Sequence, residues 1–150
     1  MDTATRFPLR LVDSVAELTA ADAGCVAVTA SHGGVSAGRY ALAVRPVLTV
    51  FNDAGVGLRQ AGVAALPLMQ SADLAACTVA HTSACIGEAQ STWATGTVSH
   101  ANAAALAWGV RVGEALQQQI THRVVPTAPV QPGSCRKSGV GSAPNASDST

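Results

Sequence analysis

Three short apolar runs, each followed by polar and small residues, constrain the fold of this chain more than any other feature of its sequence. They are CVAVTA (25–30), VLTVF (47–51) and AACTVA (75–80). Short apolar runs rich in β-branched residues are typical of strands that are covered on both faces. The stretches between these runs are suited to helices. Strand–helix alternation at this spacing predicts an α/β fold with right-handed βαβ crossovers and a small parallel sheet.

Several stretches carry helix signals, and a helical segment is expected after the third strand. Ser14 and Glu17 have the spacing of a capping box, and Gly24 suits the position just after a helix. Pro67 lies within another expected helix and should kink or shorten it. The segment 83–99 reads as a long loop or a broken helix. The helices are expected at about 14–22, 35–45, 60–71, 100–108 and 113–121.

The length and the change in composition predict one domain with a tail. A chain of 150 residues suits a single α/β domain with its own core, expected over residues 1–125. From Pro126 onward proline, glycine and serine dominate and no periodicity is visible. Such a composition cannot bury enough apolar surface to order itself. Residues 126–150 are therefore expected to form a flexible tail.

The charge content bears on the partners of this chain. Hydrophobic residues make up 48% and charged residues only 12%, a ratio that predicts self-association or a partner subunit. Nine basic and nine acidic residues give a formal net charge of zero, and aromatic residues make up 3%. Nucleic-acid binding normally needs a basic surface or a stacking platform. We therefore expect a small-molecule substrate and no nucleic-acid partner.

The N-terminal segment and the cysteines predict a location. The segment MDTATRFPLR lacks the apolar region of a secretory signal, and no apolar stretch reaches the roughly 20 residues that span a bilayer. The four cysteines, at positions 25, 77, 85 and 135, have no CxxC spacing. A reduced, cytoplasmic protein without membrane contact is the simplest interpretation.

Titratable residues follow all three apolar runs. His32, Asp53 and His81 stand where the expected strands end, and two of the four histidines of the chain are among them. Ligands of open parallel sheets bind outside the carboxyl ends of the strands. Glycines next to these residues would let backbone and ligand approach closely. The sequence therefore predicts a functional site formed by His32, Asp53 and His81.

Acid–base catalysis is the first chemistry that these residues suggest. Histidine titrates near neutral pH, and an aspartate can fix its tautomer. The amides of Gly33 and Gly34 would hold a carboxylate or a developing oxyanion. The expected function is a small hydrolase or isomerase that acts on a polar metabolite containing a carbonyl or carboxylate group. The residues expected around the substrate are Ser31, Gly33, Gly34, Asn52, Gly55, Ser83 and Glu88.

Two further chemistries use the same residues. Cys85 lies on the loop after the third run and could act as a nucleophile in a Cys–His–Asp set, with Ser31 and Ser83 as competing nucleophiles. Its other interpretation is a buried cysteine at the start of a helix. His32, Asp53 and His81 could also form a 2-His-1-carboxylate site for a divalent metal, with Glu88 as an added ligand. The sequence leaves metal-dependent and metal-free chemistry open.

Nucleotide cofactors and one further polar patch complete the sequence evidence. The segment SHGGVSAG matches neither GxxxxGK[ST] nor GxGxxG, and Lys137 is the only lysine, so no nucleotide cofactor is expected. Ser99, His100 and Asn102 are interpreted as a helix cap with a solvated histidine. The alternative to an enzyme is an assembly or ligand-sensing subunit, in which the polar strand ends are ordinary turn residues.

Overall fold

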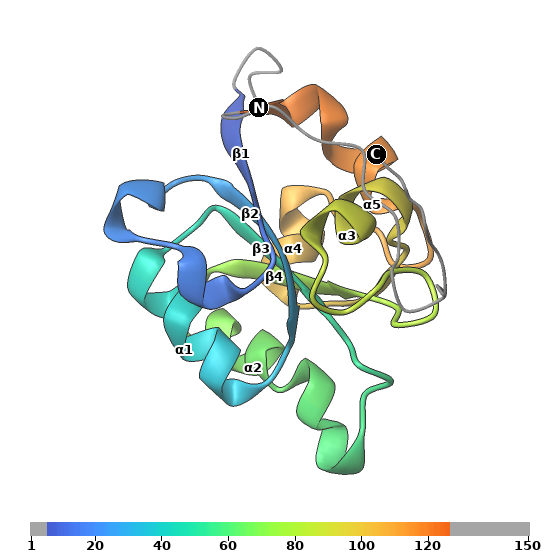
Figure 1. Ribbon diagram of the computed structural model, residues 1–150. Helices are drawn as coiled ribbons and strands as arrows, with labels where there is room; N and C mark the ends of the chain where they lie inside the picture. Colours follow the sequence, from blue (N-terminus) through green and yellow to red (C-terminus); the bar gives the residue numbers. More distant parts are fainter. Residues whose placement is uncertain (1–5, 127–150) are drawn as a thin grey trace, which may run out of the picture.

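A six-stranded sheet organises the chain in the computed structural model, which describes residues 6–126 (Figure 1). The order across the sheet is β5-β4-β3-β2-β1-β6. All neighbouring strands pair in parallel except β4 and β5, which are antiparallel. The α/β fold with a mostly parallel sheet is therefore confirmed. The strands are β1 (Phe7–Val12), β2 (Val26–His32), β3 (Leu48–Asn52), β4 (Ala75–Val79), β5 (Val98–Ala101) and β6 (Val124–Pro126).

The three apolar runs of the sequence form the centre of this sheet. Every residue of β3 and β4 is buried, as are the first five residues of β2. Successive side chains alternate between the two faces, so each strand must place apolar residues on both sides. Ala27 and Phe51 belong to one core, whereas Val28 and Val50 belong to the other. The continuous apolar runs in the sequence are therefore explained by a sheet that is covered on both faces.

Helices cover both faces of the sheet. In Figure 1, α1 and α2 lie on one side of the strands, and α3 and α5 lie on the other. Met69 of α2 is fully buried in the first core, and Leu116 of α5 is fully buried in the second. The helices are α1 (Val35–Val44), α2 (Ala65–Gln70), α3 (Ala89–Thr95), α4 (Ala103–Trp108) and α5 (Leu116–Ile120). The 3₁₀ helices are η1 (Val15–Glu17), η2 (Ala20–Asp22), η3 (Leu58–Val63) and η4 (Thr121–Arg123).

The helix expected at 14–22 is wrong in kind. The structure has two single 3₁₀ turns there, η1 and η2, each with its own capping box. Ser14 and Glu17 form the first box, as their spacing predicts, but Thr19 and Asp22 form a second one directly after it. The backbone is extended at Leu18, which ends the first turn, and at Thr19, which caps the second. One capping signal was therefore recognised and its neighbour was missed.

The expected helix at 60–71 is divided into η3 and α2. Pro67 is the third residue of α2, within the first turn, where its missing N–H group breaks no helical hydrogen bond. The proline therefore restricts where the helix begins, and α2 continues beyond it to Gln70.

Three strands escaped the sequence analysis, because each lacks a continuous apolar run. β1 contains Pro8 and Arg10, and the Arg10 Nε atom lies 2.9 Å from Asp22 Oδ1. β5 has only four residues and lies in a segment expected to be loop and helix. β6 has three residues and pairs with β1. The expected helix at 100–108 accordingly begins later, at Ala103.

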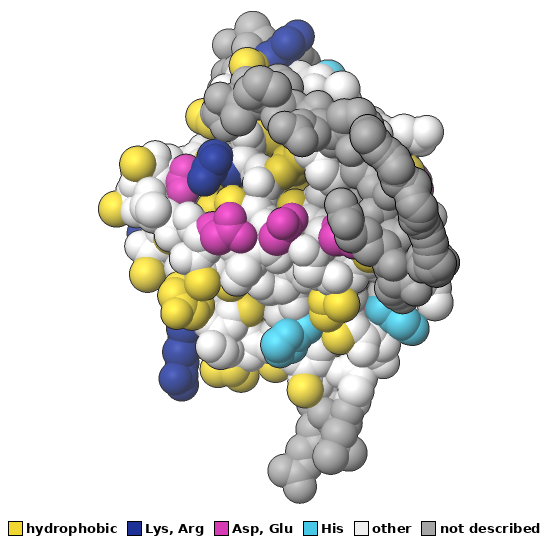
Figure 2. All heavy atoms as spheres, in the orientation of Figure 1, with side chains coloured by type: hydrophobic (Ala, Val, Ile, Leu, Met, Phe, Trp, Pro, Cys, Tyr) yellow, Lys and Arg dark blue, Asp and Glu magenta, His cyan; other side chains and the backbone are white. Residues whose placement is uncertain are grey.

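The surface and the chain ends complete the description. Asp and Glu side chains form a row across the face in Figure 2, while the Lys and Arg side chains visible there lie apart from one another. Within residues 6–126, no helix is long and apolar enough to cross a membrane. The tail expected at 126–150 lies outside the described residues, apart from Pro126.

Candidate functional site

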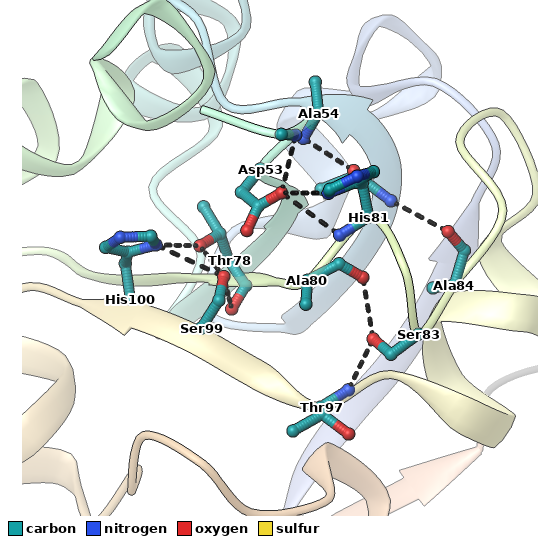
Figure 3. Close-up of polar contacts among 12 residues, drawn as sticks. Asp53, Ala54, Thr78, Ala80, His81, Ser83, Ala84, Thr97, Ser99 and His100 are labelled. Atoms are coloured by element: carbon teal, nitrogen blue, oxygen red, sulfur yellow. Dashed lines mark hydrogen bonds and ion pairs between the residues drawn. The ribbon is translucent and has the colours of Figure 1, made fainter. Parts of the chain in front are cut away.

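Asp53 and His81 form the centre of the site, at the carboxyl ends of β3 and β4. Asp53 is 4% exposed, and its Oδ1 atom accepts hydrogen bonds from the backbone N–H of Gly55 (2.8 Å) and of His81 (3.1 Å). The His81 Nδ1 atom lies 3.4 Å from the same oxygen (Figure 3). The His81 side chain is 53% exposed. A buried carboxylate therefore holds an imidazole that solvent can reach.

The surroundings of Asp53 keep its carboxyl group ionised. Burial by itself raises the pKa, but the Gly55 N–H, the Ser99 hydroxyl and His81 together hold the pKa of Asp53 below its usual range. An ionised carboxylate beside Nδ1 favours the tautomer with the proton on Nδ1. That tautomer leaves Nε2 of His81 as the proton acceptor.

A β-bulge brings two further polar residues to Asp53. Thr78 of β4 pairs with His100 and Val79 pairs with Val98, so Ser99 is an extra residue on β5. Bulges re-aim side chains and are common beside active sites. The Ser99 Oγ atom lies 2.8 Å from Thr78 Oγ1, and His100 Nδ1 lies 3.2 Å from Ser99 Oγ. Figure 3 shows His81 on one side of Asp53, with Ser99, Thr78 and His100 on the other.

A pocket of about 520 Å³ lies beside this bulge. Its walls include Val63, Leu66 and Pro67 from η3 and α2, and Ser99, His100 and Val112 from the region of β5. The described lining residues are mostly apolar and include no Arg, Lys, Asp or Glu. Ser99 both lines the pocket and contributes to the lowered pKa of Asp53. One hydroxyl therefore connects the pocket to the buried carboxylate.

The loop after Asp53 is strained and tightly packed. All four residues from 54 to 57 have positive φ, among them Ala54 (51°) and Val56 (71°). Positive φ is unfavourable for residues with a Cβ and most of all for a β-branched one. A Cβ on Gly62 would lie 1.9 Å from the Asp53 carbonyl oxygen. Loop conformation and close packing thus hold the backbone of Asp53 in place, and such strain tends to gather at functional sites.

His32 lies outside this cluster. It ends β2, is exposed, and pairs with Asn52 in the sheet register. Its ring packs over Gly34, where a Cβ would lie 3.0 Å from Nε2. Among the described residues, the hydrogen bonds and ion pair of the Asp53 cluster reach His81, Ser99, Thr78 and His100, and none of them reaches the His32 ring. Of the three histidine and aspartate residues expected together, the structure joins Asp53 and His81.

The glycines after His32 have a structural role that the sequence analysis assigned differently. The N–H of Gly33 donates to the Asn52 carbonyl oxygen (3.0 Å), and the N–H of Gly34 donates to the His32 carbonyl oxygen (2.9 Å). These amides thus already donate to backbone carbonyl oxygens, and the expectation that they hold an anion stays a prediction. A Cβ on Gly33 would lie 2.6 Å from the Gly62 carbonyl oxygen, so this glycine is required by packing.

Three polar residues expected around a substrate are engaged in the fold. Ser31 Oγ accepts the N–H of Val15 (2.9 Å). The fully buried Asn52 accepts the N–H of Ala54 (2.7 Å) and donates to the Ala84 carbonyl oxygen (3.2 Å). Ser83 Oγ donates to the Ala80 carbonyl oxygen and accepts the N–H of Thr97. These bonds build the loops around the site, and a direct contact with substrate stays a prediction.

The remaining expected residues occupy different places. Gly55 packs under the His81 ring, since a Cβ there would lie 3.5 Å from Cε1. Glu88 precedes α3 as its N-cap residue. Cys85 is 4% exposed, and its sulfur is disulfide-bonded. A sulfur in a disulfide is not a nucleophilic thiolate. We therefore do not carry the Cys–His–Asp route forward.

The metal alternative finds no suitable group of ligands. Among residues 6–126, no three or more His, Cys, Asp or Glu side chains lie close enough together to hold a metal ion. The 2-His-1-carboxylate set of His32, Asp53 and His81 is thus not formed. The physical reason is that the His32 ring lies over Gly34 and outside the Asp53 network.

Sequence reasoning missed Thr78, Ser99 and His100 as members of the site. It recognised the Ser99–His100–Asn102 patch but assigned all of it to a helix start. Asn102 does cap α4, accepting the N–H of Ala105 (2.8 Å). Ser99 and His100 instead belong to β5, and a polar pair in a short edge strand was the available signal.

No protein-family model, curated protein or solved structure matches this chain. The function is therefore argued from the geometry of the site.

Proposed function

We propose that this chain is a small enzyme that transfers protons on a polar, carbonyl-containing metabolite, in hydrolysis or isomerisation. His81 is the acid–base group and Asp53 positions it. The observation that carries the proposal is the buried, ionised Asp53 within 3.4 Å of Nδ1 of the exposed His81. In many enzymes a carboxylate placed in this way orients a histidine base and fixes its tautomer.

The proton balance of the proposed step is simple. Nε2 of His81 takes a proton from water that attacks a carbonyl carbon, or from the carbon next to that carbonyl. The proton on Nδ1 stays in place beside Asp53, whose charge stabilises the imidazolium. In hydrolysis the imidazolium then gives its proton to the leaving group. In the isomerisation of an α-hydroxycarbonyl compound it gives the proton to the former carbonyl carbon, while the hydroxyl proton passes through water to the former carbonyl oxygen. No cofactor is required for either reaction.

Solvent exchange and ester hydrolysis test this proposal. The purified protein is incubated in D₂O with a panel of small ketones and aldehydes, followed by NMR, and separately with short esters. His81→Asn should slow any catalysed reaction by about 100-fold, the usual contribution of a general base. His122→Asn changes an exposed histidine of η4 and serves as the matched control. Equal rates for all three proteins would overturn the assignment of His81.

The tautomer of His81 provides a second, activity-independent readout. ¹⁵N NMR of the imidazole should show the proton on Nδ1, and Asp53→Asn should weaken that preference. The ligand-sensing alternative predicts a ligand that binds and is never turned over by the unmodified protein. A proton on Nδ1 and a loss of turnover in His81→Asn would together distinguish a positioned base from a solvated surface histidine.

Location and assembly belong to the proposal as well. We propose self-association, with no nucleic-acid partner, because the chain has few charges and a net charge of zero. Analytical ultracentrifugation measures the assembly state.

We propose a cytoplasmic location on the sequence features given above. A disulfide at Cys85 is unusual in a reducing compartment. Mass spectrometry of alkylated Cys85 peptides from cells tests that location.

A further inference from the structure

Cys85 takes part in a disulfide bond that the proposed function does not use. The chain has four cysteines, at positions 25, 77, 85 and 135. Cys25 and Cys77 are free and buried in the two cores, whereas the Cys85 sulfur is disulfide-bonded. A disulfide within the chain needs a second cysteine, and Cys135 is the one that remains. The count of cysteines therefore leads from Cys85 to the C-terminal segment.

We infer that the segment 127–137 docks on the surface around Cys85, where a disulfide between Cys85 and Cys135 holds it. The surface consists of Cys85, Glu88 and Asp13, and we call it the α3 face because it lies at the start of α3. The inference is independent of the proposed catalysis, because neither His81 nor Asp53 takes part in it.

Printed contacts hold the α3 face together at the carboxyl end of β1. The N–H of Glu88 donates to the Cys85 carbonyl oxygen (3.2 Å). Asp13 directly follows β1, and its Oδ1 atom accepts the N–H of Ala89, the first residue of α3 (2.9 Å). The turn that carries Cys85 is therefore fixed beside the residue that ends the β1 strand.

The last described strand points toward this face. β6 runs parallel to β1, and its last residue, Pro126, pairs with Leu9. The end of β1 at Val12 lies about 10 Å further in the strand direction, at about 3.3 Å per residue. Nine residue steps separate Pro126 from Cys135, and an extended chain spans about 30 Å over that length. The segment therefore starts in the right direction and is long enough to reach Cys85.

Charge complementarity favours the same occupant. Arg136 and Lys137 directly follow Cys135 and are the only adjacent basic pair in the sequence. A bond at Cys135 keeps the backbone of both residues within about 7 Å of that cysteine. Asp13 and Glu88 supply carboxylates on the α3 face. Opposite charges at such separations attract each other, and salt weakens the attraction at an exposed site.

The bond forms by reversible exchange with a small-molecule disulfide such as oxidised glutathione. The thiols of Cys85 and Cys135 give up two protons and two electrons as their S–S bond forms. The S–S bond of oxidised glutathione breaks and takes up both, so that two molecules of glutathione leave. Reducing conditions therefore release the segment, and oxidising conditions hold it on the α3 face.

Peptide mapping tests the bond in the full chain. The protein is equilibrated with oxidised glutathione, digested with pepsin at low pH without reduction, and examined by tandem mass spectrometry. We expect a peptide containing Cys85 joined to one containing Cys135, and its loss in Cys135→Ser. Cys85 recovered as a free thiol, or joined to any cysteine other than Cys135, would overturn the inference.

Matched charge reversals test the docking. The equilibrium constant for forming the bond from glutathione disulfide is measured for each variant. Arg136→Glu should lower it by about threefold, in the range of exposed ion pairs, and the difference should shrink in about 1 M salt. Arg39→Glu changes an exposed residue of α1, on the other side of the sheet from α3 (Figure 1), and should leave the constant unchanged. Equal constants for Arg136→Glu and Arg39→Glu would overturn the docking on the α3 face.

Discussion

The carboxyl end of β2 and the carboxyl ends of β3 and β4 look alike in sequence but have different roles in the fold. β2 ends in a serine and a histidine, and two glycines follow; the glycine amides and the serine oxygen form hydrogen bonds with the backbone. After β3 and β4, Asp53 and His81 meet, and the antiparallel β5 adds Ser99 and His100. The difference lies in the neighbouring elements and not in the residue types at the strand end.

This comparison shows what makes a polar strand end into a candidate site. The end of β2 faces η3, whose Gly62 carbonyl leaves no room for a side chain at Gly33. β4 lies beside the edge strand β5, whose bulge supplies hydroxyl and imidazole groups. Ligand sites of parallel sheets lie at the carboxyl ends of the strands. Only some of those ends have polar side chains from a neighbouring element beside them.

The largest expected effect concerns packing at the end of β2. Gly33→Ala should lower the free energy of unfolding by about 3 kcal/mol, because its Cβ meets the Gly62 carbonyl oxygen, which the backbone cannot easily move. Gly34→Ala is the matched control. Its Cβ meets the end of the exposed His32 side chain, which can rotate away. Urea unfolding of both variants measures the difference, and equal losses would contradict the packing role of Gly33.

The second effect concerns charge at the end of β3. Asp53→Asn should cost about 2 kcal/mol at pH 7, because the N–H groups of Gly55 and His81 then bond to a neutral amide oxygen in place of a charged carboxylate. Folding lowers the pKa of Asp53, so its ionisation stabilises the fold above the unfolded pKa of about 4, and this stabilisation is lost as the pH falls through the folded pKa.

The gap between the two proteins should therefore narrow in acid. Urea unfolding at pH 7 and at pH 3 checks this. Asp73→Asn is the control, because Asn tolerates the positive φ (59°) of that position equally well. A pH-independent gap would contradict the ionised state of Asp53.

A smaller effect tests the contribution of β5. Ser99→Ala should cost about 1 kcal/mol, the usual net value of one hydrogen bond. It should also raise the pKa of Asp53 towards its ordinary range, because the Ser99 hydroxyl that helps to lower this pKa is removed. NMR titration of the Asp53 carboxyl carbon measures the second effect. An unchanged titration would show that the bulge does not act on Asp53.

The smallest effect separates the two histidines. His32→Asn should change stability by less than about 0.5 kcal/mol, as expected for an exposed side chain outside the polar network. It should leave any His81-dependent reaction unchanged. Urea unfolding and the exchange assay in D₂O measure both. A loss of turnover equal to that of His81→Asn would restore His32 to the site and remove the contrast between the two strand ends.

The fold was predicted correctly where consecutive residues of a strand are all apolar. The three apolar runs became β2, β3 and β4, because strands covered on both faces need apolar residues at every position. Prediction failed at the periphery. β1 and β5 contain proline, arginine, serine and histidine, and they are strands because they pair with β2 and β4, which are distant in sequence or separated by a helix. Local propensity carries little of that information.

Half of the expected catalytic cluster could be anticipated, and its partners could not. Asp53 and His81 follow adjacent strands, so the parallel topology alone brings them to one edge of the sheet. His32 is the last residue of a third adjacent strand and nevertheless lies apart, because its ring packs over Gly34. Ser99 joins Asp53 only through the antiparallel pairing of β5 and a one-residue bulge.

Apolar periodicity and strand-end chemistry are local properties that a sequence displays directly. Register, bulges and side-chain direction depend on contacts between distant residues, and these contacts exist only once the chain has folded.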